Sequence, residues 1–206
     1  AQESRGLGDV YKRQPMAQGK KALIFVDVQR DFCTGSLAVP GAEAQLEKLQ
    51  DLLNRSTPEF YDVAIFSMDK HPANHSSFKE HGGLWPPHCV VDTPGAELVL
   101  DVSTIQIPFF VVSKGDGADD AYSAFQGHAE YVSSDSVAKL LHDLDVKEVD
   151  ICGWALDYCV KHTALDAAKY GFKTRVHLAY CSAVDSTNTV AVIKELHDAG
   201  VTTADE

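Results

Sequence analysis

The sequence predicts an α/β fold: a three-layer, doubly wound, mostly parallel sheet of about six strands with helices on both faces. Three observations lead to this prediction. Short apolar runs recur along the chain and are nearly continuous in Val, Ile, Leu and Phe, which is typical of strands covered on both faces. Segments with helical periodicity separate most of these runs. The connections are short, and strands that alternate with helices in this way indicate a parallel sheet.

The apolar runs and the periodic segments give the order of the elements. Strands are expected at residues 22–28, 63–67, 108–113, 149–153 and 174–179, and 201–203 is a candidate for a sixth, short strand. Helices are expected at residues 42–53, 136–144, 158–170 and 187–199. Gly171 and Gly200 follow the last two helices, where glycine commonly ends a helix.

Length and composition indicate one domain. The chain has 206 residues, of which 45% are hydrophobic and 23% charged, as in an ordinary globular protein. We find no repeat, low-complexity tract or linker, so residues 20–206 are expected to form a single domain. Residues 1–19 lack apolar periodicity, and we expect them to be a non-native or disordered N-terminal extension.

Charge and cysteine usage argue against several classes of function. The formal net charge of -12 argues against binding to nucleic acid or to anionic membranes. No run of eighteen apolar residues occurs, so no membrane-spanning helix is expected. The five cysteines have no regular spacing, which argues against a disulfide framework and favours a reducing, cytoplasmic compartment.

The segment from residue 69 to residue 88 contains the types of side chain that bind a divalent transition metal. Asp69, His71, His75 and His88 all lie in it, directly after an apolar run. One carboxylate with two or three imidazoles is a metal-ligand set that leaves coordination positions open. Because the apolar run predicts a strand, these side chains are expected at the strand's carboxyl end, where open α/β sheets bind ligands.

Three further reactive groups follow predicted strands. Asp27 ends the first, Lys114 ends the third, and Cys159 follows the fourth. Each has an ordinary alternative role: Asp27 as a turn cap, Lys114 as a solvated charge and Cys159 as a small buried residue. Asp157 is a candidate N-cap that would place Cys159 in the first turn of a helix, where the helix dipole favours a thiolate. We interpret the other four cysteines as small buried residues. They are Cys33, Cys89, Cys152 and Cys181.

These residues belong to a set of motifs in a specific order. The set comprises D-V-Q-x-D-F at 27–32, S-x-D-x-H-P-x-x-H at 67–75, W-P-x-H-C at 85–89, K-G at 114–115 before A-Y-S-x-F at 121–125, and G-x-A-x-D-Y-C-V-x-x-T-A-x-D-A at 153–167. With this set the chain resembles the nicotinamidase (pyrazinamidase-type) group of the isochorismatase-like cysteine hydrolases. The resemblance runs from about residue 21 to the C-terminus.

The resemblance implies roles for individual residues. The catalytic Asp, Lys and Cys of the family correspond to Asp27, Lys114 and Cys159. Its metal ligands correspond to Asp69, His71 and His88, which would bind one divalent ion, zinc first and iron or manganese as alternatives. His75 is a further candidate ligand, but the position of this residue differs between subgroups. We interpret it as a neighbour of the ligands rather than a ligand.

The resemblance also implies an oxyanion hole and a ring-binding pocket. The oxyanion hole would use the backbone N–H groups of Ala155 and Cys159, after a cis peptide between Trp154 and Ala155. A pyridine ring would lie between Phe32 and Trp85. Leu37 and Tyr122 would form further walls, and the alternative for all four side chains is ordinary core packing.

The activity implied by the resemblance is metal-dependent hydrolysis of nicotinamide to nicotinate and ammonia through a thioester, a step of NAD salvage. Pyrazinamide-like amides are further expected substrates, and a homo-oligomer is one expectation because relatives often associate. Two alternatives stay open. One is a family member acting on another carbamoyl or ureido compound or an enol ether, although such relatives generally lack the metal set. The other is a catalytically silent binding protein, against which the intact Asp27, Lys114 and Cys159 argue. A thiol-redox role is weaker, because no second cysteine neighbours Cys159.

Overall fold

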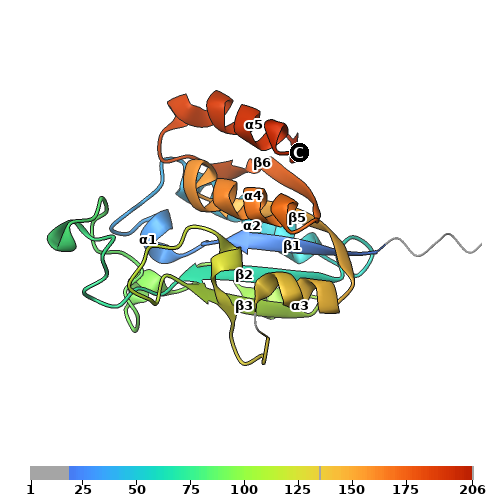
Figure 1. Cartoon of the computed structure of the whole chain (residues 1–206), viewed down its shortest axis with the longest axis horizontal. Coiled ribbons are helices and arrows are strands. Elements are labelled where there is room, and N and C mark those ends of the chain that lie inside the picture. Colours follow the sequence, from blue (N-terminus) through green and yellow to red (C-terminus); the bar gives the residue numbers. More distant parts are fainter. Residues whose placement is uncertain (1–18, 135, 206) are drawn as a thin grey trace, which may run out of the picture.

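The computed structural model describes residues 19–134 and 136–205 and shows one sheet between two layers of helices (Figure 1). Within these residues the sheet has seven strands in the order β4-β3-β2-β1-β5-β6-β7. Their bounds are β1 (Lys20–Val26), β2 (Val63–Asp69), β3 (Phe109–Lys114), β4 (His128–Ala129), β5 (Val146–Trp154), β6 (Lys173–Ser182) and β7 (Thr202–Ala204). Every neighbouring pair is parallel except β3 and β4. The predicted fold class is confirmed.

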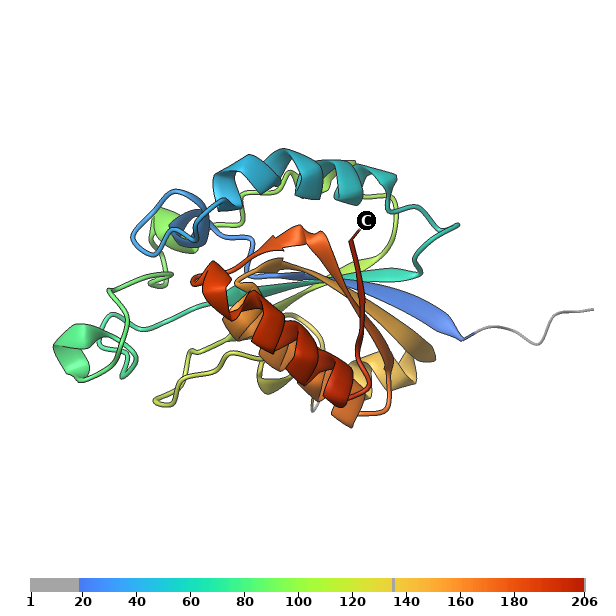
Figure 2. The ribbon, with the colours of Figure 1, turned by 90° about the horizontal axis from the view of Figure 1, so that it is seen from above.

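Helices cover both faces of the sheet. They are α1 (Arg30–Cys33), α2 (Ala42–Arg55), α3 (Val137–Asp143), α4 (Lys161–Lys169) and α5 (Thr189–Asp198). Helix α2 lies over one face, and α3, α4 and α5 lie over the other (Figure 2). On the α2 side, Phe25 and Phe66 stack with ring centroids 5.1 Å apart, in one buried cluster with Leu49 and Leu53. Burying each such side chain contributes about 1.5–3 kcal/mol.

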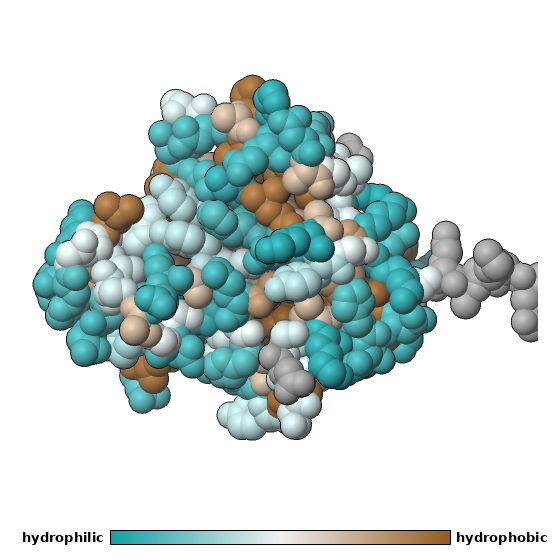
Figure 3. Space-filling model, in the orientation of Figure 1, coloured by the Kyte–Doolittle hydropathy of each residue, from teal (hydrophilic) through white to brown (hydrophobic). Residues whose placement is uncertain are grey.

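The opposite face has its own apolar core. Ile24 and Ile65 of the sheet pack there in one cluster with Leu141 of α3, Ala164 of α4 and Leu196 of α5. The outer surfaces of these helices are largely hydrophilic, with apolar residues in scattered patches (Figure 3). This pattern is expected of amphipathic helices that bury one stripe. No helix among the described residues is long and apolar enough to cross a membrane.

The structure differs from the sequence prediction in three details. Strand β4 was not predicted, because two residues that pair antiparallel with β3 are too few to form an apolar run. The first strand ends at Val26 rather than at residue 28, since Asp27 takes a left-handed conformation with a φ of 49°. The third predicted helix, residues 158–170, is preceded and partly replaced by a π-helical turn, Leu156–Val160, ahead of α4. The expected N-terminal extension lies, apart from residue 19, outside the described residues.

The strand order creates a crevice beside the central strand. From β1 the chain moves to β2 and β3 on one side, and later to β5 on the other. Ligands of open α/β sheets bind outside the carboxyl ends of the strands at such a switch point. Strands β1 and β5 approach closely there, because Gly153 has a φ of 113° and a Cβ atom on it would lie 2.2 Å from the Val26 carbonyl oxygen. Asp27 follows β1, Cys159 follows β5, and Lys114 ends β3.

A buried polar cluster lies away from the crevice, on the α2 side of the sheet. The Oδ2 atom of Asp150 accepts a hydrogen bond from the Tyr61 hydroxyl at 2.9 Å. The same atom lies 2.7 Å from Nζ of Lys21 and 2.8 Å from Nε2 of His177. Burial alone would raise the pKa of the Asp150 carboxyl, but these neighbours lower it to about 2. The charged carboxylate is therefore part of the folded structure.

The Asp150 cluster predicts a specific loss of stability in acid. The folded pKa of about 2 lies below the unfolded value of about 3.9, so ionised Asp150 favours folding. This contribution, about 2 kcal/mol, is complete above the unfolded pKa and is lost as the pH falls through the folded pKa, about half of it by pH 3. In urea unfolding, Asp150→Asn should be less stable than the parent at pH 6, and the difference should shrink towards pH 3. Asp143→Asn, at an exposed ion pair, is the control. A pH-independent difference would contradict the interpretation.

Candidate active site

Lys114 lies at the centre of the polar residues in the crevice. Its side chain is fully buried, and Nζ lies 2.8 Å from Oδ2 of Asp27. Nζ also forms an ion pair with Asp69 Oδ1 and donates a hydrogen bond to the Ala121 carbonyl at 3.1 Å. The Sγ atom of Cys159 is 3.6 Å from the same nitrogen. The structure therefore brings together Asp27, Lys114 and Cys159, which are far apart in the sequence.

The charge of Lys114 is balanced by the two carboxylates. Burial alone would lower the pKa of a lysine, but Asp27 and Asp69 raise that of Lys114 well above its usual value. The ammonium group is thus retained inside the protein. A buried charge of this kind is tolerated only when it is paired and hydrogen-bonded.

Asp27 and Cys159 are close neighbours, with a carboxylate oxygen and the Sγ atom within 4.8 Å of each other. Burial raises the pKa of the Asp27 carboxyl, and the opposing effect of Lys114 does not cancel this shift. Burial likewise raises the pKa of the Cys159 thiol well above its usual value. The Ser67 hydroxyl donates to Asp27 Oδ1 at 2.7 Å and orients the carboxylate. Burial therefore shifts both groups towards their protonated forms, and Asp27 is the neighbouring group that can accept the thiol proton.

Asp69, His71 and His88 form a buried group in which each offers one ligand atom, all within 4.8 Å of one another. The Nε2 atoms of His71 and His88 lie 3.4 and 3.8 Å from Asp69 Oδ2. Their Nδ1 atoms lie 2.7 Å from the Gly115 carbonyl oxygen and 2.8 Å from that of Pro86. Because a carbonyl can only accept, each Nδ1 carries a proton, which leaves Nε2 as the ring atom that faces Asp69.

The arrangement fits a divalent metal ion. Nε2 of His71 is buried and has no hydrogen-bond partner among the described residues. A buried acceptor without a partner is unusual, and a metal ion would satisfy it. The carboxylate of Asp69 is available as a third ligand, because Lys114 and His71 lower its pKa against the effect of burial.

His75 lies beside this group. Its ring stacks on that of His71, with centroids 4.2 Å apart and an interplanar angle of 28°. Its Nδ1 atom is 2.7 Å from the Ser77 hydroxyl. The nearest set of ligand atoms that includes His75 contains His71 and the exposed Asp120, without Asp69 or His88. This position is consistent with the interpretation of His75 as a neighbour of the metal ligands. A role for His75 as a ligand stays a prediction.

Two residues of the D-V-Q-x-D-F motif hold the backbone beside the metal-ligand candidates. The buried amide of Gln29 donates from Nε2 to the Asp69 carbonyl, and its Oε1 accepts from the Asp69 N–H, both at 2.8 Å. Asp31 Oδ2 accepts from the N–H of Cys89, the residue after His88, at 2.8 Å. Sequence reasoning included both residues in a motif but assigned them no role.

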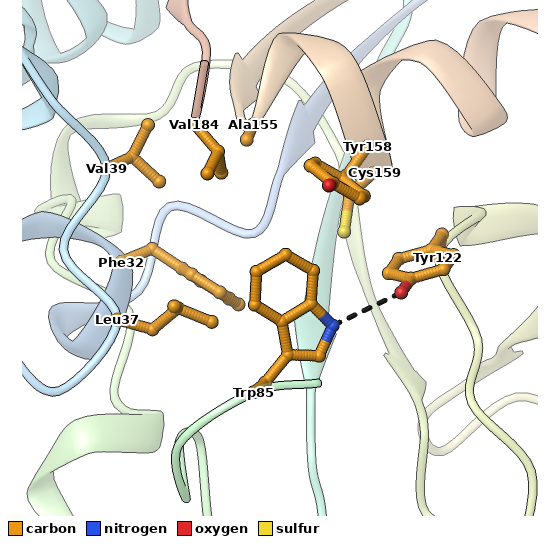
Figure 4. Close-up of a pocket in the computed structure, with 9 residues that line it drawn as sticks. All are labelled: Phe32, Leu37, Val39, Trp85, Tyr122, Ala155, Tyr158, Cys159 and Val184. Atoms are coloured by element: carbon orange, nitrogen blue, oxygen red, sulfur yellow. Dashed lines mark hydrogen bonds between the residues drawn. The ribbon is translucent and has the colours of Figure 1, made fainter. Parts of the chain in front are cut away.

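A small apolar cavity opens beside Cys159 (Figure 4). Its volume is about 30 Å³. The four predicted walls all line it, together with three residues that sequence reasoning missed. The lining residues are Phe32, Leu37, Val39, Trp85, Tyr122, Ala155, Tyr158, Cys159 and Val184. The indole of Trp85 lies between Phe32 and Tyr122, and its Nε1 donates to the Tyr122 hydroxyl at 3.2 Å. A cavity of this size holds about one water molecule, so an aromatic ligand requires these side chains to move.

Two features define the turn that contains Cys159: the peptide before it and the hydrogen bonds of Asp157. The peptide between Trp154 and Ala155 is cis, as predicted. The prediction that Asp157 is an N-cap is wrong, because its carboxylate instead accepts the N–H groups of Val184 and Asp185 at 2.8 and 2.9 Å. These long-range bonds hold the cavity wall at Val184 against the Cys159 turn. The cysteines at 33, 89, 152 and 181 are free and buried, as predicted.

Curated proteins of known activity are similar to the chain over most of its length. It is 39% identical to the nicotinamidase/pyrazinamidase of Mycobacterium tuberculosis, covering 88% of this chain and 96% of that protein. It is 35% identical to the nicotinamidase of Escherichia coli, covering 88% and 93%.

Solved structures agree with this similarity. The pyrazinamidase of Pyrococcus horikoshii in complex with zinc superposes with a TM-score of 0.79 at 35% identity, covering 91% of this chain and 99% of that chain. PnC1 of L. infantum in complex with nicotinate gives a TM-score of 0.80 at 38% identity, covering 90% and 92%. The model of the isochorismatase domain matches residues 21–206. The chain therefore belongs to the isochorismatase family.

Proposed function

We propose that this protein hydrolyses nicotinamide to nicotinate and ammonia, with Cys159 as the nucleophile. The observation that carries the proposal is the joint placement of Cys159, Asp27 and Lys114 beside a cavity with aromatic walls. The relatives named above support it, since they are nicotinamidases and pyrazinamidases. The flat walls formed by Phe32, Trp85 and Tyr122 favour a planar ring over a linear carbamoyl substrate.

Asp69, His71 and His88 would hold a divalent metal ion, and zinc is the first candidate because a relative was crystallised with it. When bound, the ion supplies a positively charged Lewis acid that can accept the ring nitrogen of the substrate. The residues that would hold the ion lie next to the cavity beside Cys159. Phe32 contacts both the cavity and the candidate metal ligands, because it lines the cavity and its ring centroid lies 5.4 Å from that of His88.

Acylation uses the buried polar groups. Asp27 accepts the proton of the Cys159 thiol, and the sulfur attacks the carboxamide carbon. The backbone N–H groups of Ala155 and Cys159 would donate to the oxyanion. As the C–N bond breaks, Asp27 returns the proton to the leaving nitrogen, and ammonia departs. Throughout, Lys114 keeps its ammonium beside the carboxylate that exchanges the proton.

Deacylation repeats the same proton movements. Asp27 accepts a proton from a water molecule as its oxygen attacks the thioester carbon. The second intermediate collapses with cleavage of the C–S bond, and the proton returns to the sulfur of Cys159. The product is nicotinic acid, which releases its remaining proton to solvent as nicotinate, and the thiol and the carboxylate are restored. Acid quenching during turnover, followed by peptide mass spectrometry, should find a nicotinoyl group on the peptide that contains Cys159.

The nucleophile assignment predicts the behaviour of a Cys159→Ala variant. Nicotinamide turnover should fall by about 1,000-fold or more, because the covalent route is lost. Metal content should stay at the parental level, since Cys159 is outside the Asp69, His71 and His88 group. Ammonia release and elemental analysis measure the two effects. Cys181→Ala, which removes another buried thiol, is the control and should keep its turnover. Substantial turnover by Cys159→Ala would refute the assignment.

The hydrogen bonds of Gln29 predict an effect on metal affinity. Gln29→Glu removes the donor to the Asp69 carbonyl while keeping the side-chain shape. The affinity for zinc should fall about 10- to 100-fold, as for other residues that orient metal ligands. Competition with a chromogenic chelator measures this affinity without any substrate. His71→Ala provides the upper limit of the loss.

The half-buried amide of Gln50 provides a matched control for this prediction. It bonds to residues of the 101–104 segment, away from the metal-ligand candidates. Gln50→Glu should retain the parental zinc affinity. Equal affinities of the parent and of Gln29→Glu would show that Gln29 does not position Asp69.

A further inference from the structure

A second cavity lies apart from the candidate active site, on the α2 side of the sheet. Its volume is about 250 Å³, much larger than that of the cavity beside Cys159. Lys21 near the start of β1, Arg55 at the end of α2 and Tyr61 just before β2 contribute to it. In parallel βαβ units these positions lie at the amino-terminal edge of the sheet, whereas Cys159 follows the carboxyl end of β5. The proposed amide hydrolysis uses none of these residues.

Lys21 and Arg55 line this cavity and no acidic residue among those described does, although the nearby Asp62 carboxylate accepts a hydrogen bond from the Lys21 N–H. Lys21 and Arg55 are cationic, and the adjacent carboxylate of Asp150 is shared by Lys21 and His177. Among residues 19–134 and 136–205, no carboxylate oxygen lies within 4.0 Å of the Arg55 guanidinium. That group instead donates from Nη2 to the Tyr180 hydroxyl at 3.1 Å and from Nε to the Asp51 carbonyl at 3.2 Å. A cationic cavity stands out in a chain whose net charge is -12, and it would concentrate a small anion.

Aromatic side chains form much of the remaining wall. Phe60, Tyr61, Tyr180 and the ring of His177 all line the cavity. Phe60 is 60% exposed, which is unusual for a large apolar side chain and places its ring within reach of a ligand. Tyr61 is already fixed, because its hydroxyl bonds to Asp150. Flat apolar walls beside a cation suit a planar ring that carries a negative group.

We propose that this cavity binds a small aromatic or heteroaromatic carboxylate. The carboxylate group would pair with Arg55, whose planar guanidinium suits two-point contact with it, and with Lys21. The ring would lie against Phe60 and Tyr180. The site is independent of the proposed amide hydrolysis, since the two cavities share no lining residue.

A heavy-atom probe tests the location of this site. Crystals soaked with 4-iodobenzoate should show an anomalous peak for iodine between Phe60 and Tyr180. Such a peak is separable from one beside Cys159, where the same compound would bind if it entered the active site. 4-Iodobenzyl alcohol, which has the ring without the charge, should give no peak in this cavity. The absence of the 4-iodobenzoate peak, or equal peaks for both compounds, would overturn the proposal.

Solution affinity distinguishes a binding site from occupancy at crystal concentrations only. Calorimetric titration of 4-iodobenzoate should show a component that weakens about tenfold in Arg55→Gln and is retained in Lys194→Gln, a charge-matched control on α5. Phe60→Ala changes only an exposed side chain and should weaken the same component. Identical titrations of the parent and of both cavity variants would contradict the proposal. A dimer of this chain that covers the cavity and excludes the probe would also contradict it.

Discussion

The buried ammonium group of Lys114 is the interaction on which the rest of the site depends. It ends β3 and pairs with carboxylates that follow β1 and end β2, so one cation joins the ends of three neighbouring strands. Without it, Asp27 and Asp69 would be two buried carboxylates without a fixed countercharge, and at least one would have to bind a proton. The residues proposed to transfer protons and the candidate metal ligands therefore form one connected group, because they share this charge.

The same lysine leaves its two carboxylates in different states. Asp69 gains further stabilisation of its charged form from His71, and its pKa is lowered despite burial. Asp27 accepts a hydrogen bond from Ser67, but Lys114 is its one cationic partner among the described residues, and burial raises its pKa. Two carboxyl groups whose surroundings push their pKa values apart are suited to different tasks. One suits a permanent anion that binds a metal ion, and the other suits a group that gains and releases a proton.

Much of the fold and the site could be predicted because strand ends are visible as the ends of apolar runs. Asp27, Lys114 and Cys159 each follow such a run, and parallel pairing brings these ends together. Other features depend on contacts between distant segments. Asp157 has the sequence position of an N-cap, but the distant N–H groups of Val184 and Asp185 bind its carboxylate instead. Val184 becomes a cavity wall only through that contact. Strand β4 has two residues and is defined by its partner, so no local pattern reveals it.

The most direct test is ammonia release from nicotinamide by the purified protein, as isolated, after chelation, and after zinc is returned. The proposed mechanism predicts rapid release that falls when elemental analysis shows the metal to be gone and that recovers with zinc. Absence of release from zinc-loaded protein would contradict the proposed reaction. Undiminished release from protein shown to be free of metal would contradict the role of Asp69, His71 and His88, while leaving the chemistry of Cys159 in place.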